Sequence, residues 1–338
     1  MQDKSSHHRA GSNFLVIRFS SLGDVILTAP VFENIKTNYP GSFIYFLTKK
    51  QYRDVFQEDP FVDRVVALED FSFPLLVKFI HSIKASVIFD LHNSLRSNLL
   101  DFLSFSKVYK VKKYRRERKK ILSGEKIEIP PVRERYIEPL LRAGLKVHTT
   151  IPKIYLSKTE IENGKKILLN LGIPENSQVI SVAPLSKWKN KEWSHFPEFF
   201  EIAVKPGRFF LILGDDFKRA EKFLPEKSYI RSFIKNVSGT LSLRDVFSLL
   251  YHSDLLISVD SGIYHAGEAL GIPTIVFFGP TVPAFGFSPV KAKVLEVDIP
   301  CRPCHLHGGN FCKRGDHACL DSISPDEVLD AVEEMLNR

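Results

Sequence analysis

The chain has 338 residues, of which 44% are hydrophobic and 25% charged, and its formal net charge is +8 at pH 7. It is too long for one typical domain and fits two domains of roughly 150 residues each. The composition is that of an ordinary globular protein, and no apolar run approaches the roughly 20 residues that a membrane-spanning helix needs.

The positive charge indicates an anionic partner. No helix-turn-helix, zinc-finger or RNA-binding motif accompanies it, so we expect no nucleic acid among the partners. Residues 1–12 are polar and lack an apolar signal region. We therefore expect a disordered tail on a cytoplasmic protein.

Short apolar strands alternate with helical segments through the first half of the chain. Strands are expected at residues 14–19, 43–47, 65–68 and 87–89, and helices at 30–38 and 75–83. This alternation predicts a parallel sheet with helices on both faces. The first half is therefore Rossmann-like, although the turn after its first strand is not the G-x-G-x-x-G fingerprint of dinucleotide-binding proteins.

Residues 107–120 (KVYKVKKYRRERKK) carry nine Lys or Arg in fourteen residues. Such a run is usually a solvated basic face, and the functional alternative is a clamp for phosphates or for an anionic membrane surface. Alternation at 108–111 predicts the last strand of the first domain. An amphipathic helix is expected at 133–142, and the domain boundary follows it.

The second half repeats the same pattern. Strands are expected at 179–182, 209–213, 234–237, 255–259, 274–278 and 294–297, and helices at 196–204, 216–223, 243–251 and 263–270. We therefore predict a first domain at 13–150, a second at 151–324 and a closing helix within 325–338. Two similar α/β halves that face one another would place the natural site in the cleft between them.

Residues 254–280 (DLLISVDSGIYHAGEALGIPTIVFFGP) form the most informative stretch. A buried strand ends at the polar turn Asp260-Ser261-Gly262, and a helix follows. A helix N-terminus at the carboxyl end of a parallel strand can bind an anion, and Gly262 lets a ligand approach the backbone. His265 lies one turn inside the helix and could donate to the same ligand. The alternative is a capped helix with an ordinary surface histidine.

Two other loops hold candidate site residues. In residues 20–24 (SSLGD), Asp24 is either a general base or a helix-capping carboxylate. In residues 184–193 (PLSKWKNKEW), three lysines interleave with both tryptophans of the chain. That loop either neutralises a diphosphate or is a basic surface loop whose tryptophans pack on the next helix.

All four cysteines lie within residues 301–319, as C-R-P-C followed by Cys312 and Cys319. A cytoplasmic protein seldom forms disulfides, and a C-x-x-C pair with two further cysteines is typical of a tetrahedral zinc site. The second pair has the wider spacing C-x6-C. We predict a structural role for Cys301, Cys304, Cys312 and Cys319, with zinc as the candidate metal.

These pieces in order resemble glycosyltransferase family 9, the ADP-heptose:lipopolysaccharide heptosyltransferases. RFSSLGDVILTAP resembles the opening motif of the family, SKWKNKEW its lysine and tryptophan loop, and VDSGIYHAGEALGIPTIVFFGPT its nucleotide-sugar motif. The cysteine cluster resembles a segment that many members carry. The ordered set covers residues from about 14 to 336.

The resemblance implies a GT-B architecture, with two Rossmann-like parallel-sheet domains facing a central cleft and the closing helix packed back toward the first domain. It implies inverting transfer of heptose from ADP-heptose to the lipopolysaccharide inner core, with Asp24 as general base and no cofactor or catalytic metal. The acceptor-binding residues it implies are Arg18, Ser21 and Gly23. The nucleotide-sugar-binding residues it implies are Ser186, Trp188, Lys191, Asp260, Ser261, Gly262 and His265.

Two departures from the family pattern affect the donor side. Leu185 stands where the family usually has glycine, and the acid expected to bind the ribose is not clearly placed, although Asp215 or Asp216 could serve. The alternatives are a related transferase using another nucleotide sugar and a catalytically silent nucleotide-sugar-binding protein. The family's acceptor is anchored in the cytoplasmic leaflet, so peripheral association with the inner membrane is also expected.

Overall fold

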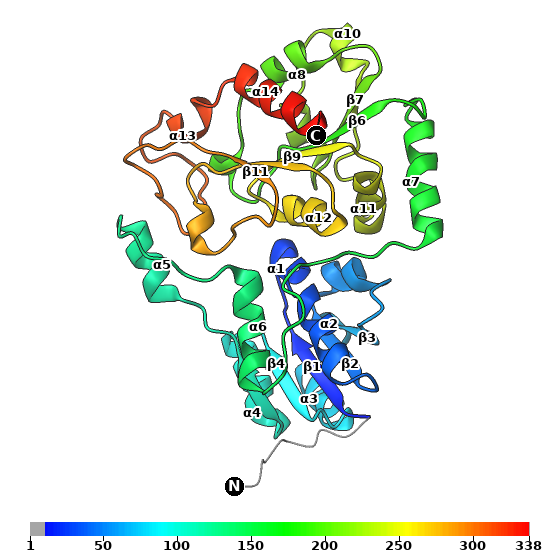
Figure 1. Cartoon of the computed structure of the whole chain (residues 1–338), viewed down its shortest axis with the longest axis vertical. Helices are drawn as coiled ribbons and strands as arrows, with labels where there is room; N and C mark the ends of the chain where they lie inside the picture. Colours follow the sequence, from blue (N-terminus) through cyan, green and yellow to red (C-terminus); the bar gives the residue numbers. More distant parts are fainter. Residues whose placement is uncertain (1–10, 338) are drawn as a thin grey trace. The chain divides into compact units, whose positions relative to one another are not determined.

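The structure, a computed structural model, describes residues 11–337 (Figure 1). The predicted tail, residues 1–12, lies almost wholly outside this range. The chain forms two compact units, the first comprising residues up to 113 together with 132–155, and the second comprising 114–131 and the residues from 156 onward. Within residues 11–337, no helix combines the length and apolar character needed to cross a membrane.

The first unit contains a five-stranded parallel sheet in the order β3-β2-β1-β4-β5 (Figure 1). Its strands are β1 (Asn13–Ile17), β2 (Phe43–Thr48), β3 (Arg64–Ala67), β4 (Val87–Asp90) and β5 (Lys107–Lys110). Its helices are α1 (Leu22–Ile26), α2 (Ala29–Asn38), η1 (Lys50–Phe56), η2 (Leu68–Asp70), α3 (Phe73–Ser82), α4 (Leu95–Ser104) and α6 (Val132–Arg142).

Helices cover both faces of this sheet because its central strands are apolar on both sides. On one face, Leu76 of α3 and Leu100 of α4 are buried in a cluster with Ile17. On the other, the Phe32 ring of α2 lies 5.2 Å from the ring of Phe46. Such burial supplies most of the stability of a parallel sheet.

The second unit contains a six-stranded parallel sheet in the order β11-β10-β9-β6-β7-β8. Its strands are β6 (Gln178–Ala183), β7 (Arg208–Ile212), β8 (Ile234–Asn236), β9 (Leu255–Val259), β10 (Thr274–Phe277) and β11 (Lys293–Leu295). Its longer helices are α5 (Arg115–Leu122), α7 (Lys158–Asn170), α8 (Phe196–Ala203), α11 (Leu243–Tyr251), α12 (Gly262–Leu270) and α14 (Pro325–Leu336). Its short helices are η3 (Lys189–Lys191), α9 (Phe217–Glu221), α10 (Ser228–Arg231), η4 (Pro283–Phe285) and α13 (Ala318–Asp321). The prediction of two parallel α/β sheets is confirmed.

One segment is grouped differently from the predicted boundaries. Residues 114–131, which contain α5, belong to the second unit and not to the first. The reason lies in Arg118, whose Nη2 donates to the carbonyl of Leu306 at 3.0 Å and whose guanidinium carbon lies 5.5 Å from the centre of the Phe285 ring. These contacts fasten a charged helix to the cysteine-rich part of the second unit.

The closing helix, α14, has its buried face in the core of the second unit. Val328, Ala331 and Val332 pack in the same cluster as residues of α8 and β9. The Pro at its first position and the Ser324 side chain, which accepts from the Glu327 N–H, define where the helix begins. Packing of this helix toward the first unit stays a prediction.

Candidate functional site

In the first unit, polar side chains gather where β1 ends. Asp24, at the third position of α1, accepts hydrogen bonds through Oδ2 from the N–H (3.3 Å) and hydroxyl (3.0 Å) of Ser21. Arg18 Nη2 lies 2.8 Å from the same oxygen, and the Tyr136 hydroxyl donates to Oδ1 at 2.9 Å. Three residues predicted for this site therefore meet, and Gly23 lies buried between them in α1.

Asp24 is ionised at neutral pH in this environment. Burial is the largest influence on its pKa and raises it, but Arg18 and the hydrogen bonds from Tyr136 and Ser21 together outweigh burial and leave the pKa below its ordinary value. Burial raises the pKa of Tyr136 well above its ordinary value, so its hydroxyl keeps the proton that it donates. The result is a nearly enclosed carboxylate, with 15% of its side chain exposed.

His92 joins the same edge of the sheet from the end of β4, which pairs with β1. Its ring centre lies 4.7 Å from that of Phe19, and its Nδ1 has no hydrogen-bond partner among residues 11–337. Burial, with Arg18 and Lys113 nearby, lowers its pKa to about 4, so it is neutral at pH 7. Arg18 Nη1 donates to the carbonyl of Leu91 at 2.7 Å and so links the two strand ends.

In the second unit, the corresponding polar group lies at the end of β9. Lys191 Nζ lies 2.6 Å from Asp260 Oδ2, and the Thr281 hydroxyl donates to the same oxygen at 2.7 Å. The side chains of Lys191 and Asp260 are 11% and 12% exposed. Lys191 and Asp260 were predicted to share a site and do meet, whereas Thr281 was not predicted.

The N-terminus of α12 follows directly. The Ser261 hydroxyl accepts from the N–H of Ile263 at 3.4 Å and caps the helix, which begins at Gly262. His265 lies one turn inside this helix and is buried, with its ring centre 3.8 Å from that of Tyr264. The structure therefore places His265 against aromatic side chains, not at an exposed surface.

The loop before Lys191 is held by an ion pair that sequence patterns did not reveal. The Ser186 N–H donates to Glu192 Oε1 at 3.0 Å, and Arg219 both pairs with Glu192 and donates to the Ser186 carbonyl at 2.9 Å. Leu185 is buried beside Gly214, where an added Cβ would lie 2.8 Å from Leu185 Cδ1. Leu185 therefore fills the space above a glycine on the neighbouring strand end.

Trp188 contacts the cysteine-rich segment. A Cβ added at Gly308, whose φ is +106°, would lie 2.7 Å from Trp188 Cβ, so the two backbones approach closely. Asn190 fastens the same pair of loops, because its Oδ1 accepts from the Gly309 N–H at 2.7 Å. Lys187 Nζ lies 5.2 Å from the centre of the Trp188 ring.

The two acids considered for ribose binding differ in their surroundings. The Asp216 side chain accepts from the Arg219 N–H at 3.0 Å and caps α9. Asp215 precedes it and is exposed. Of these two carboxylates, Asp215 is the more accessible to a ligand.

The four cysteines carry free thiols. In the part of the chain that the structure describes, no three Cys, His, Asp or Glu side chains are placed so that they could hold a metal ion. Burial and the neighbouring Cys301 and Cys312 raise the pKa of Cys304, and burial with the other cysteines raises that of Cys319 to about 12. For Cys312, backbone N–H groups of residues 314–317 outweigh burial and lower the pKa.

The two units have the fold of GT-B proteins, as comparison with solved structures shows. A glycosyltransferase family 9 protein from Veillonella parvula superposes with a TM-score of 0.78 at 19% identity, covering 96% of this chain and 97% of that one. The Escherichia coli ADP-heptose lipopolysaccharide heptosyltransferase II gives a TM-score of 0.76 at 19% identity, with coverages of 96% and 98%.

The model of glycosyltransferase family 9 (heptosyltransferase) matches residues 76–309. The chain belongs to this family and is a glycosyl-transfer enzyme, as its sequence motifs predicted. It is also 23% identical to lipooligosaccharide heptosyltransferase 2 of Haemophilus influenzae, over 96% of this chain and 99% of that protein.

Proposed function

We propose that this enzyme transfers heptose from ADP-heptose to the inner core of lipopolysaccharide, with inversion at the anomeric carbon. Heptosyltransferase relatives along the whole chain support the sugar, and the name of the Escherichia coli relative supports the donor. The observation that carries the chemistry is the ionised carboxylate of Asp24 at the carboxyl end of β1. Ligands of parallel α/β sheets bind at this edge.

Asp24 acts as the general base. A carboxylate offers about four lone-pair sites. Three donors from Ser21 and Arg18 converge on Oδ2, whereas among residues 11–337 only Tyr136 donates to Oδ1. The remaining site on Oδ1 accepts the proton of the acceptor hydroxyl. Arg18 uses one N–H of each terminal nitrogen, on Asp24 and on the carbonyl of Leu91, so it holds Asp24 in place and keeps a second N–H on each nitrogen for the acceptor.

The second unit binds the donor. As the acceptor oxygen attacks the anomeric carbon, the bond from that carbon to the diphosphate oxygen breaks and ADP leaves with the electron pair. Lys191 and the N-terminus of α12, with Ser261 and Gly262, stabilise the negative charge on this leaving group. Asp260 and Thr281 keep the lysine and the turn in place. Positive charge from the protein makes a catalytic metal ion unnecessary in this scheme.

A donor screen tests this function. ADP-heptose and other nucleotide sugars are incubated with lipopolysaccharide-core acceptors, and the products are identified by mass. Addition of one heptose from ADP-heptose, undiminished by EDTA, is the expected result. Transfer from another nucleotide sugar alone would favour a related transferase, and binding of ADP without transfer to any acceptor would favour a silent binding protein.

Zinc at the four cysteines stays a prediction of their spacing. Elemental analysis of reduced, purified protein tests it, and one equivalent of zinc would support a structural ion. Metal-free protein with an unchanged unfolding temperature would refute a structural zinc ion. The EDTA experiment above separates this role from catalysis, because a structural ion need not affect turnover while the fold is intact.

A further inference from the structure

Helix α4 has polar residues on its buried side and apolar residues on its exposed side. Its buried side chains are Ser97, Leu100, Asp101 and Ser104. Its exposed apolar side chains are Leu95, Leu99 and Phe102, with 92%, 47% and 77% of their surface accessible. Spacings of four and three residues place these three on one face. A surface helix ordinarily has the opposite arrangement, with its apolar face toward the core.

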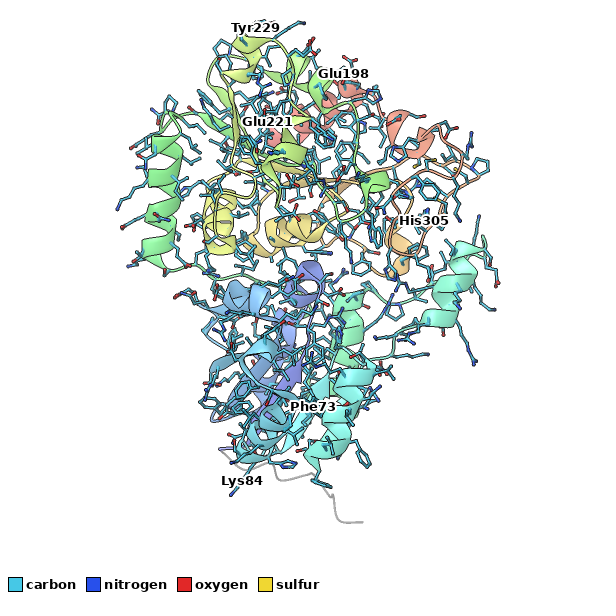
Figure 2. The ribbon with its side chains drawn as sticks, turned by 180° about the vertical axis from the view of Figure 1, so that it is seen from behind. Phe73, Lys84, Glu198, Glu221, Tyr229 and His305 are labelled. Atoms are coloured by element: carbon cyan, nitrogen blue, oxygen red, sulfur yellow. The ribbon has the colours of Figure 1, made fainter. Side chains whose placement is uncertain are left out.

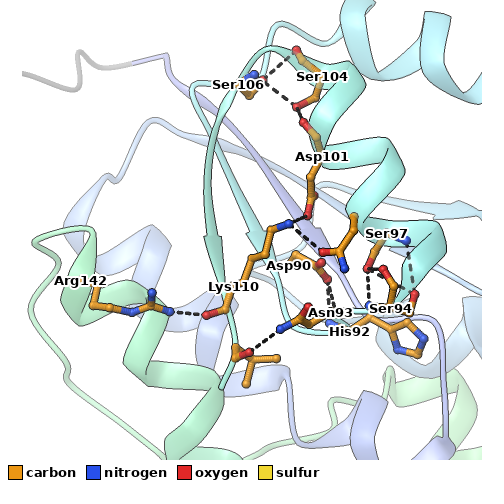
Figure 3. Close-up of polar contacts among 12 residues, drawn as sticks. Asp90, His92, Asn93, Ser94, Ser97, Asp101, Ser104, Ser106, Lys110 and Arg142 are labelled. Carbon is orange, nitrogen blue, oxygen red and sulfur yellow. Dashed lines mark hydrogen bonds and ion pairs between the residues drawn. The ribbon is translucent and has the colours of Figure 1, made fainter. Parts of the chain in front are cut away.

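Polar contacts fix α4 in this orientation. Figure 3 shows Lys110 of β5 reaching α4, where its Nζ lies 3.0 Å from Asp101 Oδ2 and 2.7 Å from Asn98 Oδ1. At the start of the helix, the Ser94 hydroxyl accepts from the Ser97 N–H, and the Ser97 hydroxyl accepts from the Ser94 N–H. Rotation of the apolar face toward the sheet would break the contacts of Lys110 with Asp101 and Asn98, so the face stays outward.

Phe105 extends the apolar face beyond the end of α4. It is 88% exposed and has a φ of 54°, in the left-handed region that favours glycine at a helix C-terminus. A bulky residue in this conformation is strained. Glycine would adopt this backbone conformation with less strain than phenylalanine. An exposed phenylalanine at this position therefore points to contact with something outside the chain.

Basic side chains surround this apolar face. Helix α3 packs against α4, its Leu75 is 56% exposed, and its His81 ring stacks on Phe105 with 5.7 Å between ring centres. The exposed basic residues are Lys78, Lys84, Arg96 and Lys107. Lys84, labelled in Figure 2, follows the C-terminal end of α3. Together, Leu75, Leu95, Leu99, Phe102, Phe105 and these four basic residues form what we term the α3/α4 surface.

The segment that contains α3 and α4 holds few acidic groups. Between residues 71 and 116 the only carboxylates are Asp90 and Asp101. Both are buried, and Asp101 is paired with Lys110. The exposed charged side chains within residues 71–116 are therefore basic.

We propose that the α3/α4 surface docks on an anionic lipid bilayer, with its apolar side chains in the headgroup boundary and its basic side chains on lipid phosphates. Exposed leucine and phenylalanine within a basic rim are the combination that binds such an interface. A protein partner with an apolar face would need acidic residues to match this rim and would bury less of it. This proposal rests on the proposed function, because docking would hold the enzyme beside an acceptor anchored in a membrane.

Vesicle co-sedimentation tests this proposal without substrates. Full-length protein is mixed with vesicles of phosphatidylcholine alone or with added phosphatidylglycerol, and binding to the anionic vesicles only is expected. Phe102→Ser with Phe105→Ser should weaken that binding about tenfold or more. Each of Lys78→Gln, Lys84→Gln and Arg96→Gln should weaken it about fivefold.

Phe105→Gly is the sharpest variant, because glycine suits the left-handed backbone. It should weaken vesicle binding while leaving the thermal unfolding midpoint unchanged or higher. Matched controls in the second unit are Tyr229→Ser, an exposed aromatic residue labelled in Figure 2, and Lys158→Gln with Lys166→Gln on α7. These controls should bind vesicles as the unmodified protein does.

Three results would overturn the proposal. The first is equal binding of the protein to neutral and anionic vesicles. The second is binding to anionic vesicles that the Phe102 and Phe105 substitutions do not weaken. The third is a protein that binds neither kind of vesicle but forms a dimer that these substitutions dissociate. Transfer of sugar to a short soluble acceptor is measured in parallel. Loss of vesicle binding with intact transfer refutes the docking surface alone, and absence of transfer with intact vesicle binding refutes the proposed function alone.

Discussion

The turn after β1 and the turn after β9 use the same kinds of side chain in opposite ways. At each turn, a carboxylate meets a basic residue and a hydroxyl near the carboxyl end of a central parallel strand. In the first unit these are Asp24, Arg18 and Tyr136. In the second they are Asp260, Lys191 and Thr281. A similar set of groups does not therefore define a single chemical role.

The difference lies in the basic residue that faces each carboxylate, because among residues 11–337 both carboxylates keep an oxygen that can accept a proton. Arg18 is tied by a second hydrogen bond to the carbonyl of Leu91. Lys191 is a compact ammonium group with further protons to offer to a ligand. We conclude that Arg18 positions a carboxylate in one unit, whereas Asp260 positions an ammonium group in the other.

Asp24→Asn should have the largest effect. The amide keeps the shape of the side chain but cannot take the acceptor proton, so kcat should fall about 10²- to 10⁴-fold. ADP affinity, measured by calorimetry, should stay at the level of the unmodified protein, because the proposed donor site lies in the other unit. Turnover near the unmodified level would remove Asp24 from the role of base.

Lys191→Ala should have the next largest effect and should act on binding. Loss of a charged donor to the diphosphate should raise the Kd for ADP about ten- to a hundredfold. Asp260→Asn should weaken ADP binding less, because the lysine stays but loses its anchor. Lys187→Ala, in the same loop, is the matched control, and equal Kd values for Lys187→Ala and Lys191→Ala would contradict the assignment.

Sequence patterns predicted most of the fold, because the buried strands of a parallel sheet are nearly continuous apolar runs that stand out in the sequence. All strands of both sheets were located, since their apolar runs are short and bounded by turn residues. Helix α7 was not predicted, although its capping box, in which Ser157 and Glu160 exchange hydrogen bonds, is a pattern typical of a helix start. Helices α4 and α5 were not predicted because each buries a single large apolar side chain, Leu100 or Ile121.

The candidate sites were predictable only in part. Asp24 and Lys191 stand in local motifs, so their positions could be assigned from the chain alone. Tyr136 contacts Asp24 from 112 residues away, and Thr281 contacts Asp260 from 21 residues away. Nothing in the local pattern marks Tyr136, and Thr281 ends a quoted motif without being singled out as a site residue. A local motif can also hold a residue that is structural. Trp193 stands in the lysine loop, yet it is fully buried and its indole N–H donates to the Ile323 carbonyl at 3.1 Å.

Tyr136→Phe should have the smallest effect on turnover. It would distinguish the two turns, because it should change the pH dependence of turnover without changing ADP binding. The Tyr136 hydroxyl stabilises ionised Asp24, so its removal should raise the pKa of that carboxyl. Because the base must be ionised, the acid limb of the kcat/KM profile should move to higher pH, while the rate at higher pH changes only a few-fold. ADP affinity should not change. The matched control, Tyr39→Phe, should leave the acid limb in place.

The same substitution has a consequence for stability whose sign follows from the lowered pKa. A carboxyl group whose pKa is depressed in the folded state stabilises the fold above its ordinary pKa, and this contribution is lost as the pH falls through the folded value. Tyr136→Phe brings the folded pKa closer to the ordinary one. The variant should therefore lose less stability than the unmodified protein between neutral and strongly acidic pH, measured by thermal unfolding. An acid limb that moves without this change in stability would mean that the kinetic pKa belongs to a group other than Asp24.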